Sequence, residues 1–355
     1  MRGSAAACGS ARIKTSTKEV AVRGLAASVS TVLLMACGQP TSSPSVPVED
    51  VSTPVASEAA ASGDRCANDG QRLVNANGVE ICTEAFGDPA DPPMLLIPGA
   101  SASMMWWDDD FCRQLAAGGR YVIRLDNRDS GESVTYPVGE PPYTLADMAQ
   151  DAVGVLDAYE IDRAHVVGRS MGGMITQHMA LDHPERLRTI TLIYSSPEGG
   201  ADQRGDLPGP AESLQGLTLE IPQNDPDAAL AARVELQRVV SGSRYPFDAE
   251  NAHALIAREI ARARHYASSG NHTVALQNSP GWRDRLSEIE VPTLVVHGTE
   301  DPLLQFPHGE ALANEIPGAT MLVMEGVGHE LPEGEWDRLI ATLLEHTAER
   351  AEDRH

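Results

Sequence analysis

The stretch Gly168-Arg169-Ser170-Met171-Gly172 decides the fold of this chain. It follows the apolar run His165-Val166-Val167, which predicts a buried strand, and it opens a helical pattern. A serine at a sharp strand-to-helix turn has strained backbone angles, and glycines two residues to either side avoid clashes where the chain doubles back. The amino end of the helix then offers free N–H groups and partial positive charge beside the hydroxyl. This context predicts a nucleophilic serine at the edge of a sheet.

Strands and helices alternate on both sides of this turn. Apolar runs predict strands, and residues spaced three or four apart predict helices around residues 111–115 and over 145–159. Such alternation implies parallel pairing, so we expect an α/β fold with a mostly parallel, doubly wound sheet. The alternation breaks between about residues 197 and 281, where two helical stretches, residues 228–240 and 250–267, indicate an inserted helical cap. The further predicted strands are residues 79–86, 94–97, 121–125, 189–194, 293–296 and 321–324.

Two later residues complete a candidate catalytic triad with Ser170. A serine hydroxyl is a weak nucleophile at neutral pH, so it needs a base, and the base needs an acid that orients it. Asp301 comes just after the predicted strand 293–296, and His329 comes just after the predicted strand 321–324. Because the carboxyl ends of parallel strands meet at one edge of a sheet, we expect both side chains near Ser170. The sequence therefore predicts the triad Ser170, Asp301 and His329.

Other residues are alternatives for the base and the acid. His297 and His308 are rival bases, although His297 precedes the acid and His308 begins the next predicted helix. Glu300 is the rival acid beside Asp301, and Glu198, after an earlier strand, is a more distant one.

The site also needs donors for an oxyanion and a wall for the substrate. Two backbone N–H groups are expected to stabilise the oxyanion. One is the N–H of Met171, directly after the serine, and the other is that of Ala100 in the turn after strand 94–97. We expect Met104 and Trp106 to line an apolar substrate pocket beneath the cap, with packing in the core as the alternative.

Several stretches together resemble the α/β-hydrolase branch that contains aclacinomycin methylesterase. They are residues 87–92, 95–106, 111, 118–124, 126–133 and 162–168, and the similarity covers roughly residues 72–347. The resemblance implies the α/β-hydrolase fold, the triad and ester hydrolysis without a cofactor. It also implies that the charged turn 126–133 is structural, so we expect no metal. Many relatives have His-Gly where this chain has Pro98-Gly99, which alters the turn before Ala100 but keeps its donor role.

These observations predict a serine hydrolase that cleaves carboxylic esters of a small molecule through an acyl-enzyme. Methyl esters or lactones of a bulky apolar acid are the expected substrates. Two alternatives keep the fold: a carbon–carbon bond hydrolase or cofactor-free perhydrolase, and a lipid-anchored binding protein with low turnover. Dehalogenase and epoxide hydrolase relatives carry aspartate in place of Ser170, which argues against those reactions.

The composition excludes other classes of function. The chain has 355 residues, of which 42% are hydrophobic and 22% charged, as in a globular protein. Lys and Arg number 27 against 51 Asp and Glu, and the net charge of −24 has the wrong sign for a phosphate-rich partner. Nucleic acid is therefore not an expected partner.

Residues 1–36 resemble a lipoprotein signal peptide. A basic stretch that ends at Arg23 precedes an apolar run too short to span a bilayer as a helix. The run ends in Leu34-Met35-Ala36-Cys37, which is similar to the lipobox of bacterial lipoproteins. This resemblance implies lipidation of Cys37, export, and a lipid anchor that holds the protein to a membrane of the cell envelope. An ordinary secretory signal with a coincidental cysteine is the alternative.

The remaining chain divides by composition. Residues 37–63 are rich in Pro, Ser and Thr and predict a disordered tether. Residues 64–197 and 281–350 are the expected hydrolase core, and residues 198–280 the expected cap. Cys66 and Cys82 flank a predicted hairpin, so in an exported protein we expect them to form a disulfide. Cys112 lies in a helical pattern, and no Cys/His spacing indicates a structural metal.

Overall fold

A computed structural model describes residues 66–68, 70–199, 204–214, 222 and 224–348 of the chain. The predicted signal peptide, the predicted tether and Cys37 lie outside these residues. Among the described helices, none combines the length and the apolar character that crossing a membrane requires.

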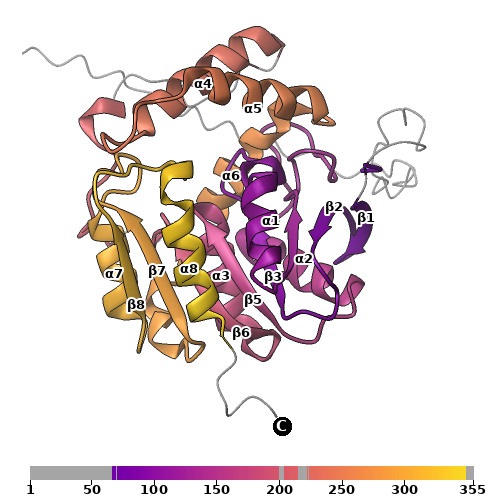
Figure 1. The fold of residues 1–355 in the computed structure, drawn as a ribbon. Coiled ribbons are helices and arrows are strands. Elements are labelled where there is room, and N and C mark those ends of the chain that lie inside the picture. Colours follow the sequence, from indigo (N-terminus) through magenta and orange to yellow (C-terminus); the bar gives the residue numbers. More distant parts are fainter. Residues whose placement is uncertain (1–65, 69, 200–203, 215–221, 223, 349–355) are drawn as a thin grey trace, which may run out of the picture. The chain divides into compact units, whose positions relative to one another are not determined.

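Within the described residues, eight strands form one sheet in the order β1-β2-β4-β3-β5-β6-β7-β8 (Figure 1). β2 pairs antiparallel with both β1 and β4, and every neighbouring pair from β4 to β8 is parallel. The predicted mostly parallel sheet is therefore confirmed. The strands are β1 (Gln71–Ala76), β2 (Val79–Phe86), β3 (Pro93–Ile97), β4 (Tyr121–Leu125), β5 (Ala164–Arg169), β6 (Leu187–Ile193), β7 (Thr293–Gly298) and β8 (Thr320–Met324).

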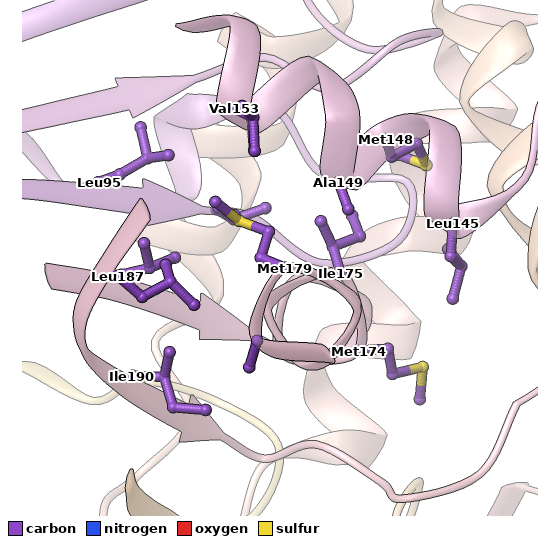
Figure 2. Packing of buried hydrophobic residues seen from close by; sticks show 14 of the residues in the cluster. Leu95, Leu145, Met148, Ala149, Val153, Met174, Ile175, Met179, Leu187 and Ile190 are labelled. Atoms are coloured by element: carbon purple, nitrogen blue, oxygen red, sulfur yellow. The ribbon is translucent and has the colours of Figure 1, made fainter. Parts of the chain in front are cut away.

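Helices cover both faces of the sheet because the strands are apolar on both sides. α2 (Leu145–Ala158), α3 (Met171–Asp182) and α7 (Pro307–Glu315) contribute to one buried cluster. Figure 2 shows part of it, where Leu145, Met148, Ala149 and Val153 of α2 lie near Ile175 and Met179 of α3. α1 (Asp109–Ala117) and α8 (Trp336–His346) contribute to the cluster on the opposite face.

This arrangement places the ends of β3 and β5 at a reversal of the strand order. From β3 the chain proceeds to β4 on one side, and it then crosses over to β5 on the other side of β3. In doubly wound sheets, ligands bind outside the carboxyl ends of the strands at such a point. The turn after β3 and Ser170 after β5 meet there.

Between β6 and β7 the chain leaves the sheet, and we call residues 198–280 the insertion. It contains α4 (Pro226–Val240), α5 (Ala249–Arg262) and α6 (Asn271–Asn278). Aspartates begin the first two helices, since Asp225 accepts the N–H of Ala228 and Asp248 accepts that of Asn251. Figure 1 shows α4 and α5 beyond the carboxyl ends of the parallel strands.

The cysteines of the described residues lie in the interior. Cys66 and Cys82 are joined by a disulfide that fastens the start of the described chain to β2. Cys112 on α1 is a free, buried thiol, and burial raises its pKa to about 12. At neutral pH this thiol stays protonated and packs as a small apolar residue.

Candidate active site

Ser170 occupies the turn between β5 and α3 in a strained conformation. Its φ of 55° and ψ of −121° lie in a region where residues other than glycine are rare. A Cβ added to Gly168 would come within 2.2 Å of the carbonyl oxygen of Gly172, and one added to Gly172 within 2.2 Å of that of Ile97. A side chain at either position would collide with neighbouring backbone, so both positions require glycine. The N–H of Ser170 donates to the Ile193 carbonyl at 2.8 Å, which holds the turn against β6.

Asp301 and His329 are joined at the same edge of the sheet. His329 Nδ1 lies 2.6 Å from Asp301 Oδ2, and the other carboxylate oxygen accepts the N–H groups of Leu303 and Leu304 at 2.9 Å each. Burial alone would raise the pKa of Asp301, but the neighbouring His329 and these hydrogen bonds hold that pKa below its ordinary value. Asp301 is therefore charged at neutral pH. It keeps the proton of His329 on Nδ1 and leaves Nε2 able to accept one.

The two rival bases have other partners. His297 is fully buried, its Nε2 lies 2.7 Å from the Leu304 carbonyl oxygen, and burial lowers its pKa. Its Nε2 also lies 3.7 Å from Asp301 Oδ2, the carboxylate oxygen that His329 contacts at 2.6 Å. His308 Nδ1 lies 2.9 Å from the hydroxyl of Ser196. His329, unlike these two, lines the same cavity as Ser170.

The two rival acids are also engaged elsewhere. Glu300 is exposed and accepts the N–H and hydroxyl of Ser243 at 2.7 and 2.8 Å. Glu198 pairs with Arg283 at 2.6 Å. Of the acids considered from the sequence, Asp301 is the one that the structure brings to His329.

The two expected oxyanion donors lie beside Ser170. Met171 is the first residue of α3, and the first amides of a helix have no acceptor within the helix. Ala100 follows Gly99, where an added Cβ would come within 3.1 Å of the Ser170 Cβ. Ala100, Met171 and Ser170 line one cavity. The arrangement can therefore present two backbone N–H groups to an oxygen bonded to a carbon that Ser170 attacks.

Side chains of the insertion hold the turn that carries Ala100. Ser101 has a φ of 56° and donates its N–H to Nδ1 of His272 at 2.9 Å. Its carbonyl oxygen accepts from Arg233 Nη2 at 2.8 Å. Both main-chain polar groups of the residue after Ala100 are thus bound by the insertion.

Glu259 on α5 fastens the same turn two residues further on. Its carboxylate accepts the N–H of Ser103 and, at 2.9 Å, the indole N–H of Trp106. It also forms an ion pair with Arg233, and it is buried. Glu259, Arg233 and His272 could not be singled out from the sequence, because no local pattern distinguishes a helix residue that binds a distant turn from one that faces solvent.

The cavity at Ser170 and His329 has a volume of about 340 Å³. The core contributes the turn around Ser170 and the loops after β3, β7 and β8. The insertion contributes one face of α4 and part of α6. The wall is mostly apolar, and its larger apolar side chains are Trp106, Met174, Leu236, Val240, Leu276, Leu303 and Leu304.

Met104 is a core residue and does not line this cavity. It is fully buried and clusters with the disulfide cysteines Cys66 and Cys82. Met104 and Trp106 belong to one 3₁₀ turn, in which successive side chains point about 120° apart. The two side chains therefore face different sides, and only Trp106 of the expected pair reaches the cavity.

Known proteins resemble this chain over most of its length. The family model of the alpha/beta hydrolase fold matches residues 92–335. Rhodomycin D methylesterase DauP of Streptomyces sp. (strain C5) is 35% identical over 294 residues, which cover 78% of this chain and 97% of that protein. Rhodomycin D methylesterase DnrP of Streptomyces peucetius is likewise 35% identical, over 78% of this chain and 97% of its own length.

A solved structure gives the same fold. The esterase EaEST from Exiguobacterium antarcticum superposes with a TM-score of 0.64 and 23% identity, covering 77% of this chain and 98% of its own. Together with the matched family model and the strained serine at the strand-to-helix turn, these likenesses show that the chain belongs to the α/β-hydrolase fold family.

Proposed function

We propose that Ser170, His329 and Asp301 form the catalytic triad of this enzyme. The chain is a carboxylic ester hydrolase by its family and by its likeness to two methylesterases. The observation that carries the triad is the hydrogen bond of 2.6 Å between His329 and Asp301, at a cavity that His329 shares with the strained Ser170.

The reaction follows from this geometry. His329 Nε2 takes the hydroxyl proton as Ser170 Oγ bonds to the ester carbonyl carbon, and the Asp301 carboxylate stabilises the imidazolium that forms. The N–H groups of Ala100 and Met171 bind the oxyanion. His329 then gives its proton to the departing alcohol, which leaves an acyl group on Ser170. Water, deprotonated by His329, cleaves that acyl-enzyme and releases the carboxylic acid.

We propose esters or lactones of bulky apolar acids, methyl esters among them, as the substrates. The cavity wall is mostly apolar, and burying apolar surface contributes roughly 25 cal/mol per Å². The two relatives are named as methylesterases of rhodomycin D, which supports a methyl ester. In a series of methyl esters, kcat/KM should rise with the apolar size of the acid. A profile that is highest for methyl acetate would contradict this substrate class.

A fluorophosphonate probe tests the nucleophile. The Ser170 oxygen displaces fluoride from phosphorus, so the wild-type protein should be labelled and the labelled peptide should contain residue 170. Ser170→Ala should abolish labelling, whereas Ser243→Ala, which alters an exposed serine of the insertion, should leave it intact. A wild-type protein that resists the probe would overturn the proposed triad.

We further propose that the protein is exported and held at a membrane surface by lipid attached to Cys37. The support is the sequence alone: a basic stretch, a short apolar run and then Leu34-Met35-Ala36-Cys37. Several acyl chains together anchor a protein firmly, because each buried CH₂ contributes about 0.8 kcal/mol.

A further inference from the structure

Arg169 is a buried cation at the wall of the candidate active site. It is the last residue of β5, directly before Ser170, and the residue is 7% exposed. One amino group, Nη2, donates to the His329 carbonyl at 2.6 Å, and the guanidinium lies 5.6 Å from the centre of the Trp106 ring. Within the part of the chain that the structure describes, no carboxylate lies within 4.0 Å of it.

Other buried arginines of the core are paired. Arg124, Arg128 and Arg283 each contact at least one carboxylate, and in each case the partners raise the pKa of the guanidinium despite its burial. Burial lowers the pKa of Arg169 instead. A guanidinium carries five N–H donors, and a buried charge without a partner is costly. Among the described residues the His329 carbonyl accepts one of these donors, so the others remain available to a further acceptor.

The nearest acids do not supply that acceptor. Glu330 acts on Arg169 from beyond ion-pair distance, and its carboxylate accepts the N–H groups of Gly242 and Gly328. Asp301 is bound to His329. Both carboxylates are thus held by other donors.

The guanidinium lies where a ligand can reach it. Arg169 lines the apolar cavity, and it also lines a neighbouring groove of about 830 Å³ between the insertion and the loop after β8. Trp106 and Gln237 line both spaces too, so the three side chains form the boundary between them. A ligand that fills the cavity can therefore present a polar group to Arg169 at its border with the groove.

We propose that Arg169 binds a carboxylate of the substrate, so that the preferred substrate is an ester with a second, free carboxyl group on an apolar body. This inference rests on the proposed ester hydrolysis. The planar guanidinium fork matches a carboxylate with two parallel hydrogen bonds. The net charge of −24 opposes anions at long range, but salt screens that field beyond about 10 Å, whereas Arg169 acts at contact.

Matched esters of suberic acid test the assignment. The monomethyl ester carries one free carboxylate, and the dimethyl ester has the same chain without it. For the wild-type enzyme, kcat/KM should be at least about tenfold higher for the monoester, as expected for a hydrogen-bonded charge pair shielded from water. Arg169→Gln should bring this ratio to about one, and Arg169→Lys should keep part of it. Arg238→Gln removes the same charge from an exposed position on α4 and should leave the ratio unchanged.

The ratio of kcat/KM for the two esters shows whether Arg169 binds the substrate carboxylate or only supports the loop that carries His329. If Arg169 only held the His329 carbonyl, Arg169→Gln would slow both esters equally and leave the ratio unchanged, which would overturn the inference. Equal wild-type rates on both esters would also overturn it, while the proposed ester hydrolysis would stand. If neither these esters nor 4-nitrophenyl acetate were cleaved, the proposed function would fall and the inference with it.

Binding to an inactive variant provides a measurement independent of turnover. By calorimetry, Ser170→Ala should bind monomethyl suberate at least about tenfold more tightly than the double variant with Arg169→Lys. Equal affinities would contradict a carboxylate contact at Arg169.

Discussion

At the residue scale, the carboxylate of Asp301 sets which ring nitrogen of His329 carries the proton. Asp301 accepts the Nδ1 proton of His329 over 2.6 Å and is itself fixed by two backbone amides. Asp301→Asn would offer an N–H to Nδ1 and favour the tautomer with its proton on Nε2, which cannot accept one from Ser170. We expect kcat for ester hydrolysis to fall by three to four orders of magnitude (roughly, by analogy with other triads) while the circular dichroism spectrum stays unchanged.

Glu300→Gln is the matched control for this prediction. It changes the adjacent, exposed acid, which binds Ser243, and should keep nearly full activity. If Asp301→Asn kept nearly full activity instead, the acid would have to be sought elsewhere, and Glu198 would be the next residue to test.

The residues of the proposed triad could be chosen from the sequence because each stands in a local context. Ser170 lies between glycines at a strand-to-helix boundary, and Asp301 and His329 follow apolar strands. Arg169 has no such context, since its sequence position beside Ser170 shows neither its burial nor that no carboxylate of the described residues lies within ion-pair distance of it. Met104 was expected to line the pocket but lies in the core, for a similar reason. The direction of a side chain in a short 3₁₀ turn depends on the packing around it.

At the scale of elements, α5 and the turn after β3 act as one unit. Glu259 binds Ser103 and Trp106 on the core and Arg233 on α4. Glu259→Ala should release the turn that carries Ala100 and weaken the oxyanion interaction, which forms only in the transition state. Because losing one oxyanion donor costs about 10²–10³-fold, we expect kcat to fall roughly ten- to a hundredfold with little change in KM.

Two further variants separate positioning from stability. Glu259→Gln keeps an acceptor oxygen and should recover much of the kcat, and Glu235→Gln, at a half-exposed site on α4, should have no effect. The rate of labelling by a fluorophosphonate should fall in parallel with kcat, since that probe uses the same oxyanion donors. An effect of Glu259→Ala on the melting temperature alone would refute the positioning role.

At this scale, local periodicity predicted the helices of the insertion but not their ends or their polar contacts. Helical spacing correctly indicated α4 and α5, although α5 ends at Arg262, before a 3₁₀ turn at Tyr266–Gly270 that the pattern did not distinguish from helix. The contacts of Glu259 join positions 156 and 153 residues apart. Spacing along one helix shows which face is apolar, but it does not show which polar residue of that helix meets a distant turn.

At the scale of the whole molecule, buried neutral histidines couple folding to pH. His165, His178, His272 and His297 are buried, and burial lowers the pKa of each, to about 3 for His165. Between a pH of about 6.5 and about 3, the unfolded chain binds a proton at residue 165 that the folded protein does not. The free energy of unfolding should therefore fall as the pH falls through this window, by up to about 1.4 kcal/mol per pH unit for this group.

Urea unfolding at pH 7.5 and pH 5.0 measures the effect. His165→Gln should show a smaller loss of unfolding free energy between the two pH values than the wild type does. His253→Gln, at an exposed position of α5, should show the wild-type loss. Identical pH dependence in the wild type and His165→Gln would exclude His165 as a source of the acid sensitivity.

The anchor proposed at Cys37 concerns where the whole molecule resides. In cells, the wild-type protein should incorporate a fatty-acid label and sediment with membranes. Cys37→Ser should lose the label and either leave the membrane fraction or accumulate as unprocessed precursor, whereas Cys8→Ser should behave as the wild type. A wild-type protein without label would disprove the lipid anchor.

The bonds between the insertion and the turn after β3 limit how this enzyme can be recombined. A graft that replaced residues 198–280 with the corresponding segment of another hydrolase would remove Arg233, Glu259 and His272 together, and with them the partners of the main chain at Ser101 and Ser103. Such a chimera would change its substrate wall and impair its oxyanion donors in the same step. New specificity should therefore arise more readily by substitutions along the cavity face of α4, such as at Leu236, than by exchange of the whole segment.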